Sequence, residues 1–367
     1  MERKDGKELR TGFSTGTAAT AAAVAAALTL AGGKPPALVE VKLPKGRTLE
    51  VPVAECSLSG GKATCVVVKD AGDDPDVTNR ARVGASASRS GEPGLALTGG
   101  RGVGRVTKPG LAIPPGEWAI NPVPRSMLKE NLAPFLPECG PGLAVEIFIE
   151  DGEALAGSTL NPRLGIVGGL SVLGTTGLVR PFSNAAYIAT IDSALSIARA
   201  AGLSECVLTT GGRSEGLARL ERPDLPEEAF VMTADFFAGG LKLAAKRGFS
   251  TVGLAVFFGK AVKQAAGHPY THAHKTDLDL GPLAGWLPGL PEGVKERILA
   301  SNTALAALEV LKAEGLERLV PEVASRALAS ARGFAGPGPS LWMRLFDFDG
   351  SVLAFETLAG ENGKEGG

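Results

Sequence analysis

The chain has 367 residues, of which 44% are hydrophobic and 21% charged, which is typical of a globular protein with two or three domains. Its net charge of −1 gives no overall field to attract nucleic acid or an acidic membrane, and no apolar run approaches the roughly 20 residues of a membrane span. Four cysteines, Cys56, Cys65, Cys139 and Cys206, show no CxxC spacing, which argues against a zinc ribbon or a disulfide framework. We therefore expect a cytoplasmic protein with neither a nucleic-acid nor a membrane partner.

The first part of the chain, residues 1–155, is predicted to be a meander-like α+β domain. It opens with an alanine-rich helix over residues 17–30, capped by Ser14 or Thr15 and packed closely on more than one side. Residues 120–125 are expected to form a rigid extended segment that leads into a helix near residues 126–136. Strands are expected at residues 38–43, 48–53, 63–69 and 143–150.

The second part, residues 156–358, is predicted to be an α/β domain with a mainly parallel sheet. Strands and helices alternate here, and the helix from about residue 184 carries an apolar stripe. The expected strands cover residues 165–168, 206–210, 230–232 and 251–257. The expected later elements are a long amphipathic helix over residues 291–315, a helix over residues 320–333, a strand over residues 351–355 and a flexible tail over residues 359–367.

Two glycine-rich stretches follow predicted strands, at residues 168–177 and 209–215. If both strands belong to the parallel sheet, both loops lie at its carboxyl edge, where open α/β sheets bind their ligands. Glycines would allow close backbone approach there, and helix N-termini would favour an anionic group.

Ionisable groups are concentrated at two places. Residues 69–76 carry four aspartates, which suit a metal, a cationic ligand or acid–base work; a solvated acidic turn is the alternative. All three histidines of the chain lie within residues 268–274, where they could bind a transition metal, move protons or serve as hydrogen-bonding groups. Pro269 argues against a helix at this point, and so against a metal site of the His-x3-His type.

Seven segments follow one another along residues 9 to about 280: TGFSTG (11–16), KDAGDDPDVT (69–78), TKPGL (107–111), GEWAINPVPR (116–125), GGLSVLGTTG (168–177), TTGGRSE (209–215) and AGHPYTH (266–272). Taken together in this order, they resemble the cobalt-precorrin-5B C-1 methyltransferase family of anaerobic cobalamin synthesis. The last ninety residues match only loosely.

The resemblance implies a methyl transfer from S-adenosylmethionine to C-1 of a corrin precursor, with cobalt present only as part of that substrate. The implied donor-binding residues come from the two glycine-rich stretches: Gly168, Gly169, Gly174, Thr175, Thr176, Thr209, Thr210, Gly211, Gly212 and Glu215. Basic and polar groups for the carboxylates of the macrocycle are Arg101, Arg105, Lys108, Asn121, Arg125, Arg213 and His268. Asp73, Asp74 and His272 are the candidate catalytic residues, expected to face one cleft. No resident metal is implied, and a homo-oligomer is left open.

Two other functions compete with this interpretation. A nicotinamide-dependent reductase would place an acidic residue about twenty positions after the glycine turn, and Asp192 stands at that distance but inside a predicted helix. A non-catalytic tetrapyrrole or cobalt carrier would use the histidine cluster.

Overall fold

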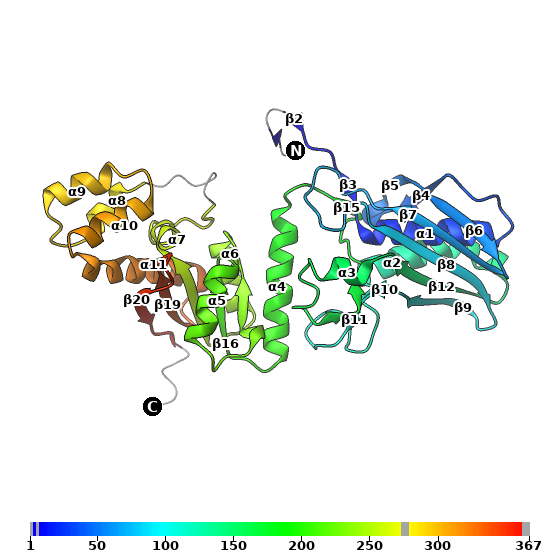
Figure 1. The fold of residues 1–367 in the computed structure, drawn as a ribbon. Coiled ribbons are helices and arrows are strands. Elements are labelled where there is room, and N and C mark those ends of the chain that lie inside the picture. Colours follow the sequence, from blue (N-terminus) through cyan, green and yellow to red (C-terminus); the bar gives the residue numbers. More distant parts are fainter. Residues whose placement is uncertain (1–2, 5–6, 273–278, 362–367) are drawn as a thin grey trace. The chain divides into compact units, whose positions relative to one another are not determined.

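A computed structural model describes residues 3–4, 7–272 and 279–361 of the chain. It divides into two compact units, residues 1–184 and 185–367 (Figure 1). The boundary expected near residue 155 is therefore placed too early, because residues 166–179 pair with strands of the first unit. The mixed α/β fold class itself is confirmed.

The first unit is built on a five-stranded sheet in the order β6-β7-β8-β12-β9. Neighbouring strands are antiparallel except β12 and β9, which run parallel. The sheet strands are β6 (Glu55–Ser59), β7 (Lys62–Val68), β8 (Arg82–Ser90), β9 (Gly94–Gly99) and β12 (Gly142–Ile149). The short paired strands are β1 (Arg3–Lys4), β2 (Lys7–Glu8), β3 (Gly12–Phe13), β4 (Leu38–Lys42), β5 (Thr48–Pro52), β10 (Gly102–Val103), β11 (Arg105–Val106), β13 (Ile166–Val167), β14 (Gly169–Leu170) and β15 (Leu178–Val179).

The alanine-rich helix α1 (Thr15–Leu30) lies in the core of this unit and packs against β7, β8 and α2 (Pro122–Leu132). All but one of its residues are buried, which small alanine side chains permit, so the predicted close packing on several sides is confirmed. Ser14 caps the helix by accepting a hydrogen bond from the Thr17 N–H at 3.2 Å. The other helices of the unit are α3 (Gly152–Ala156), η1 (Pro44–Gly46), η2 (Ala133–Phe135) and η3 (Pro137–Cys139).

One local expectation for the first unit is wrong, and three strands of its main sheet, β6, β8 and β9, are not among the predicted strands. Helix α2 begins at Pro122, so residues 122–125 are helical; both prolines fit the first turn, where no N–H donor is required. The nine-residue strand β8 was not expected, because it is rich in small residues. A side chain at Gly84 would overlap the ring of Phe148, so close packing explains the glycine in this strand.

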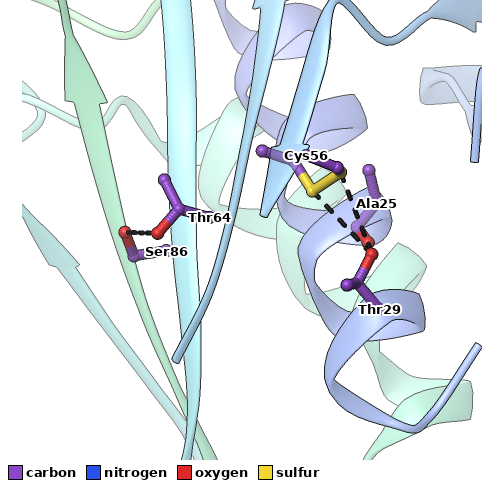
Figure 2. The surroundings of a disulfide bond; sticks show 6 residues. Ala25, Thr29, Cys56, Thr64 and Ser86 are labelled. Atoms are coloured by element: carbon purple, nitrogen blue, oxygen red, sulfur yellow. Dashed lines mark hydrogen bonds between the residues drawn. A yellow bond between two sulfur atoms is a disulfide. The ribbon is translucent and has the colours of Figure 1, made fainter. Parts of the chain in front are cut away.

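Cys56 and Cys65 form a disulfide, although their spacing predicted none (Figure 2). They lie directly opposite each other on β6 and β7, which are joined by a tight turn with Gly60 and Gly61 at positive φ. The Thr29 hydroxyl at the end of α1 lies 3.8 Å from the Cys56 Sγ. Register across a hairpin, which cysteine spacing alone does not reveal, brings the two thiols together.

The second unit contains a sheet in the order β17-β16-β18-β19-β20, parallel except for the last strand. This confirms the mainly parallel sheet. Its strands are β16 (Glu205–Thr209), β17 (Phe230–Met232), β18 (Thr251–Phe257), β19 (Ser340–Phe346) and β20 (Val352–Leu358). Its helices are α4 (Asn184–Ala200), α5 (Gly212–Glu221), α6 (Phe237–Lys246), α7 (Phe258–Ala265), α8 (Gly281–Trp286), α9 (Glu292–Leu299), α10 (Ala304–Ala313), α11 (Val320–Ala335), η4 (Glu227–Ala229) and η5 (Glu317–Leu319).

Each face of this sheet has its own core. Cys206 and Leu208 of β16 pack with α4, α6, α7 and α11, whereas Val207 packs with α5 and with Trp342 of β19. The expected helix over residues 291–315 is two helices, α9 and α10, because Thr303 caps a new helix by accepting from the Ala306 N–H at 3.1 Å. In the tail expected to be flexible, the Gly360 N–H donates to the Ser340 hydroxyl, while residues 362–367 lie outside the described part. No helix of the described residues has the length and apolarity needed to span a membrane.

Candidate functional site

Four motif segments that are far apart in sequence meet in the first unit. The Phe13 N–H donates to the Asp70 carbonyl at 2.8 Å, and the Gly16 N–H donates to the Leu173 carbonyl at 2.9 Å. The Asn121 N–H donates to the Val172 carbonyl at 3.0 Å. The segment 11–16 is therefore in main-chain contact with both the acidic turn and the glycine-rich stretch.

The glycines at this junction allow the main chain to pack closely. A side chain at Gly12 would overlap the carbonyl of Asp70, and one at Gly174 would overlap the Ser14 hydroxyl. Gly72 has a φ of +66°, and a Cβ atom there would overlap the Arg10 carbonyl oxygen. These glycines hold segments of the protein together.

The placement of the first glycine-rich stretch corrects a sequence-based expectation. Residues 166–167 form β13, which pairs antiparallel with β11, and residues 169–170 form β14, which pairs with β10. Gly168, Gly169, Gly174, Thr175 and Thr176 therefore belong to the first unit and do not lie at the carboxyl edge of the parallel sheet. A two-residue strand takes its partner from tertiary contacts, so its apolar character could not reveal which sheet it joins.

The two aspartates predicted to be catalytic each accept a main-chain hydrogen bond. An oxygen of Asp73 lies 2.7 Å from the Arg10 nitrogen, and Asp74 Oδ1 lies 2.8 Å from the nitrogen of Phe182. Phe182 has a φ of +55°, which is strained for a residue with a side chain, and the residue is 47% exposed. Asp74 thus stabilises an exposed aromatic residue in an unusual backbone conformation.

The remaining two aspartates of the turn form ion pairs. Asp70 pairs with the Arg10 guanidinium, and a hydrogen bond from this group lowers the pKa of the carboxyl. Asp76 pairs with Lys69, whose side chain is 1% exposed. Burial opposes ionisation of Asp76, but the Lys69 charge and hydrogen bonds from Lys69 and Thr78 outweigh it and lower its pKa. Each aspartate therefore has a structural partner.

Most of the predicted substrate-binding residues also lie in the first unit. The Arg105 guanidinium lies 3.9 Å from the ring centroid of Trp118 and donates to the Gly116 carbonyl at 2.7 Å. Lys108 packs against Gly165, and Arg101 is exposed just before β10. Asn121 Nδ2 donates to the Val172 carbonyl at 3.2 Å, and Arg125 lies in the first turn of α2.

The second glycine-rich stretch does lie at the carboxyl edge of the parallel sheet. The stretch directly follows β16. From there the chain runs through α5 to β17, which pairs with one edge of β16, and later to β18, which pairs with the other edge. Such a reversal of strand order is the usual ligand site of open α/β sheets. A Cβ atom on Gly211 or Gly212 would meet nothing within 4 Å, so the space at the start of α5 is open.

Polar groups surround this open start of α5. The Ser214 hydroxyl accepts from the Thr210 N–H at 3.1 Å and from the Gly211 N–H at 3.2 Å. The Thr209 side chain is fully buried, and its hydroxyl has no hydrogen-bond partner within the described residues. Because alternate residues of a strand share a face, this hydroxyl lies on the α5 side with Val207. The first N–H groups of α5 have no acceptor within the helix and suit an anionic group.

Two other predicted residues of this stretch have partners. Glu215 is buried and pairs with Arg219 at 2.8 Å, so this carboxylate is held within α5. Arg213 donates to the Phe348 carbonyl, and its guanidinium lies 5.6 Å and 5.5 Å from the ring centroids of Phe257 and Phe348. Arg213 therefore lies across the ends of β18 and β19.

The histidine segment lies beside the loops after β17 and β18. Asp235, which follows β17, pairs with Lys260 of α7, and Lys260 also donates to the Thr271 carbonyl at 3.1 Å. His272 is half-buried and follows Thr271 directly; the segment is not helical, as Pro269 predicted. His268 is half-buried at the end of α7, and His274 lies outside the described residues.

A row of aromatic rings reaches this histidine. His272 and Tyr270 have ring centroids 5.9 Å apart with planes within 4°. The ring centroids of Tyr270 and Phe236 are 5.0 Å apart, and Phe236 stacks on Tyr187 of α4 with a centroid distance of 5.1 Å. Sequence reasoning missed Asp235, Lys260 and this aromatic row. Aromatic residues near strand ends are too common to indicate a site before the fold is known.

No group of three or more His, Cys, Asp or Glu side chains within the described ranges is arranged to hold a metal ion. Asp73 and Asp74 lie in the first unit and His272 in the second, so their convergence on one cleft stays a prediction.

Comparison with known proteins gives consistent matches. The family model described as CbiD matches residues 2–181, and the model of the CbiD C-terminal domain matches residues 270–357. A cobalt-precorrin-5B C(1)-methyltransferase of Nitratidesulfovibrio vulgaris is 45% identical, over 95% of this chain and 93% of its own. Enzymes with the same name from Geobacillus kaustophilus and Pelobacter propionicus are 40% and 41% identical, over 96% and 99% of this chain and 95% and 100% of their own.

Among solved structures, the cobalamin biosynthesis protein cbiD from Archaeoglobus fulgidus is 27% identical, covering 84% of this chain and 86% of its own, with a TM-score of 0.40.

Proposed function

This chain belongs to the CbiD family, a family of methyltransferases, and we propose that it transfers a methyl group from S-adenosylmethionine to C-1 of cobalt-precorrin-5B. The observation that carries the proposal is an identity of 40–45% to the named enzymes over nearly the whole chain. Cobalt enters only as part of the substrate. In the reaction, the C-1 carbon forms a bond to the methyl group as the methyl–sulfur bond breaks, leaving S-adenosylhomocysteine.

We assign the methyl donor to the open start of α5. Thr209, Thr210, Gly211 and Gly212 leave room for a ligand, and the first N–H groups of the helix suit the carboxylate of the donor. The Thr209 hydroxyl has no hydrogen-bond partner in the described part of the chain, so it adds a buried polar group that a ligand could satisfy. Glu215 is the nearest predicted carboxylate, and its pairing with Arg219 favours a supporting role.

The corrin precursor carries many carboxylates, which basic and polar side chains would bind. The candidates in the first unit are Arg101, Arg105, Lys108, Asn121 and Arg125. In the second unit they are Arg213 and His268. The glycine-rich stretch of the first unit keeps Gly168, Gly169, Gly174, Thr175 and Thr176 as candidates for contact with either ligand; Gly168, Thr175 and Thr176 are exposed, Gly174 is half-buried and Gly169 is buried.

A sulfonium methyl donor is already activated, so alignment of the reacting atoms is the main requirement. Asp73, Asp74 and His272 stay candidates for stabilising charge or taking a proton. The hydrogen bond from Phe182 gives Asp74 a second candidate role, that of a positioning residue.

The two roles of Asp74 are separable by a pair of variants. Asp74→Asn keeps an oxygen that can accept from the Phe182 N–H but removes the charge, whereas Asp74→Ala removes both. If the charge acts in catalysis, both variants lose about 10²–10⁴-fold in single-turnover methyl transfer under saturating donor and corrin. If positioning matters, Asp74→Asn retains a near-normal rate and only Asp74→Ala is slow. Near-normal rates in both variants would remove Asp74 from the site.

The overall proposal is tested with purified protein, methyl-labelled S-adenosylmethionine and cobalt-precorrin-5B. Label transfer to the corrin is expected, and its absence with folded protein would contradict the proposal. Parallel calorimetric titrations with S-adenosylhomocysteine, NADH and cobalt(II) separate the methyltransferase from a reductase and from a cobalt carrier. Only S-adenosylhomocysteine should bind tightly. We also propose a cytoplasmic location, where a disulfide such as Cys56–Cys65 would be unusual. Light scattering would determine whether the enzyme is a homo-oligomer.

A further inference from the structure

We propose that the exposed ring of Phe348 stacks against the adenine ring of the methyl donor. The inference deepens the proposed function and rests on it, because that function supplies an S-adenosyl ligand and assigns its carboxylate to the start of α5. Exposed aromatic residues are common on protein surfaces, so exposure alone does not indicate a site. Position, orientation and chemistry together distinguish Phe348 from other exposed rings of the chain.

The ring lies at the same edge of the parallel sheet as the start of α5. Strands β16, β18 and β19 are parallel neighbours, so their carboxyl ends share this edge. The chain enters α5 after β16, β18 ends at Phe257, and Phe348 follows the end of β19 by two residues. Arg213, in the first turn of α5, donates to the Phe348 carbonyl. A Cβ atom on Gly350 would lie 3.1 Å from Leu217 of α5, so the turn that carries Phe348 packs against this helix.

One face of the Phe348 ring is covered, and the other is open. Phe257 stacks on Phe348 with a centroid distance of 5.0 Å and planes within 6°. The Arg213 guanidinium lies 5.5 Å from the Phe348 centroid and 5.6 Å from the Phe257 centroid. A group at nearly equal distances from two stacked rings lies beside or between them and leaves both outer faces uncovered. Among the described residues no second ring stacks on Phe348, which is 46% exposed, so its outer face is available to a flat ligand.

The turn that carries the ring is fixed by the protein itself. Asp347 is buried and pairs with Lys312 of α10, and its Oδ1 accepts from the Phe348 N–H at 2.6 Å. The Gly350 N–H donates to the Asp347 carbonyl at 3.1 Å and closes a tight turn, in which Gly350 has a φ of +98°. Because this turn is held in place without a ligand, stacking on the ring costs little conformational entropy.

The chemistry of an S-adenosyl ligand matches both parts of this edge. Its adenine has two flat faces, and stacking on aromatic side chains is a general way in which proteins bind bases. Its carboxylate suits the first N–H groups of α5. The flat apolar face of Phe348 offers nothing to a carboxylate, so it differs in kind from the basic and polar groups assigned to the corrin.

Calorimetric titration of the full-length protein tests the stacking. Phe348→Ala should lower the affinity for S-adenosylhomocysteine at least tenfold, whereas Phe348→Tyr keeps a flat ring and should bind like the wild type. The compound 5′-methylthioadenosine keeps the base but lacks the amino-acid end, so Phe348→Ala should weaken its binding by the same factor. Phe355→Ala is the matched control and should leave both affinities unchanged. Phe355 is 50% exposed, and its ring centroid lies 4.4 Å from the Arg344 guanidinium, but it stands in the middle of β20.

Fluorescence gives a second measurement. A stacked purine quenches tryptophan emission, so S-adenosylhomocysteine should quench the emission added in Phe348→Trp and leave that of Phe355→Trp unchanged. Circular dichroism checks that each variant is folded.

The proposal is overturned if Phe348→Ala binds both compounds as tightly as the wild type, if Phe355→Ala loses as much affinity, or if Phe348→Trp shows no quenching. A loss of affinity for the corrin alone would assign the ring to the substrate and overturn it as well. Label transfer to the corrin is scored separately. An active enzyme with undiminished donor binding in Phe348→Ala refutes only the stacking, whereas a wild-type protein that does not bind S-adenosylhomocysteine refutes the proposed function too.

Discussion

Glycine-rich motifs of similar appearance have different surroundings in the two units. At the motif junction of the first unit, Gly12, Gly72 and Gly174 lie where any side chain would overlap neighbouring atoms. At the start of α5 in the second unit, a Cβ atom on Gly211 or Gly212 would meet no atom. The former glycines join segments of the fold, whereas the latter leave a space that a ligand can fill. A glycine-rich motif therefore indicates close approach without saying whether the approaching group is protein or ligand.

The aspartates of residues 69–76 sharpen this contrast, because their partners are also structural. Asp76→Ala should have the largest effect, since it leaves the buried Lys69 ammonium without its carboxylate. We expect a loss of about 3–5 kcal/mol in the free energy of unfolding, measured by urea denaturation. The double variant Lys69→Met/Asp76→Leu removes both charges and should recover much of that loss. A fully stable Asp76→Ala protein would show that the turn is not structural.

Gly72→Ala should have the next largest effect. The positive φ and the overlap with the Arg10 carbonyl oxygen together predict a loss of about 2–4 kcal/mol in unfolding free energy. Gly211→Ala is the matched control, because its backbone is extended and its surroundings are open. That variant should stay within about 0.5 kcal/mol of the wild-type protein. Equal losses in the two variants would end the distinction between the two classes of glycine.

Gly211→Val tests the contrast between the two classes of glycine by a measurement of ligand binding. The branched side chain is expected to fill the space at the start of α5, where a Cβ atom on Gly211 has no neighbour within 4 Å. Affinity for S-adenosylhomocysteine should fall at least tenfold, or about 1.4 kcal/mol, with an unchanged melting temperature. Calorimetric titration measures the affinity. Undiminished binding in this folded variant would place the donor elsewhere.

The smallest effect near neutral pH is expected from titration of the acidic turn. The pKa values of Asp70 and Asp76 are lowered in the folded protein, so their stabilisation is present above the ordinary aspartate pKa of about 4. It is lost as the pH falls through the lowered values. These two groups should therefore leave stability unchanged between about pH 7 and 5 and reduce it below about pH 4. Asp76→Asn should weaken the fall in unfolding free energy below about pH 4, measured by urea denaturation at a series of pH values. If the fall is as steep in Asp76→Asn as in the wild-type protein, other groups cause it.

Elements with a strong local pattern could be predicted from the sequence alone. Alanine on every face of α1 indicated a helix buried on several sides, and the apolar runs of β16, β17 and β18 indicated parallel strands. The glycines after β16 were correctly placed at the carboxyl edge of the parallel sheet, because the strand–turn–helix order is itself local information. The family resemblance also followed from ordered motifs and needed no coordinates.

Tertiary structure alone decided which distant segments meet. Residues 166–167 join the first unit because they pair with β11. That strand lies about sixty residues earlier in the chain, so no local pattern reveals the pairing. Cys56 meets Cys65 because the hairpin register places them opposite each other, and Asp74 reaches Phe182 across more than one hundred residues. The row of rings that ends at His272 likewise combines three separate segments. A residue's type and spacing determine what it can bind, but its partner depends on contacts that local propensity does not encode.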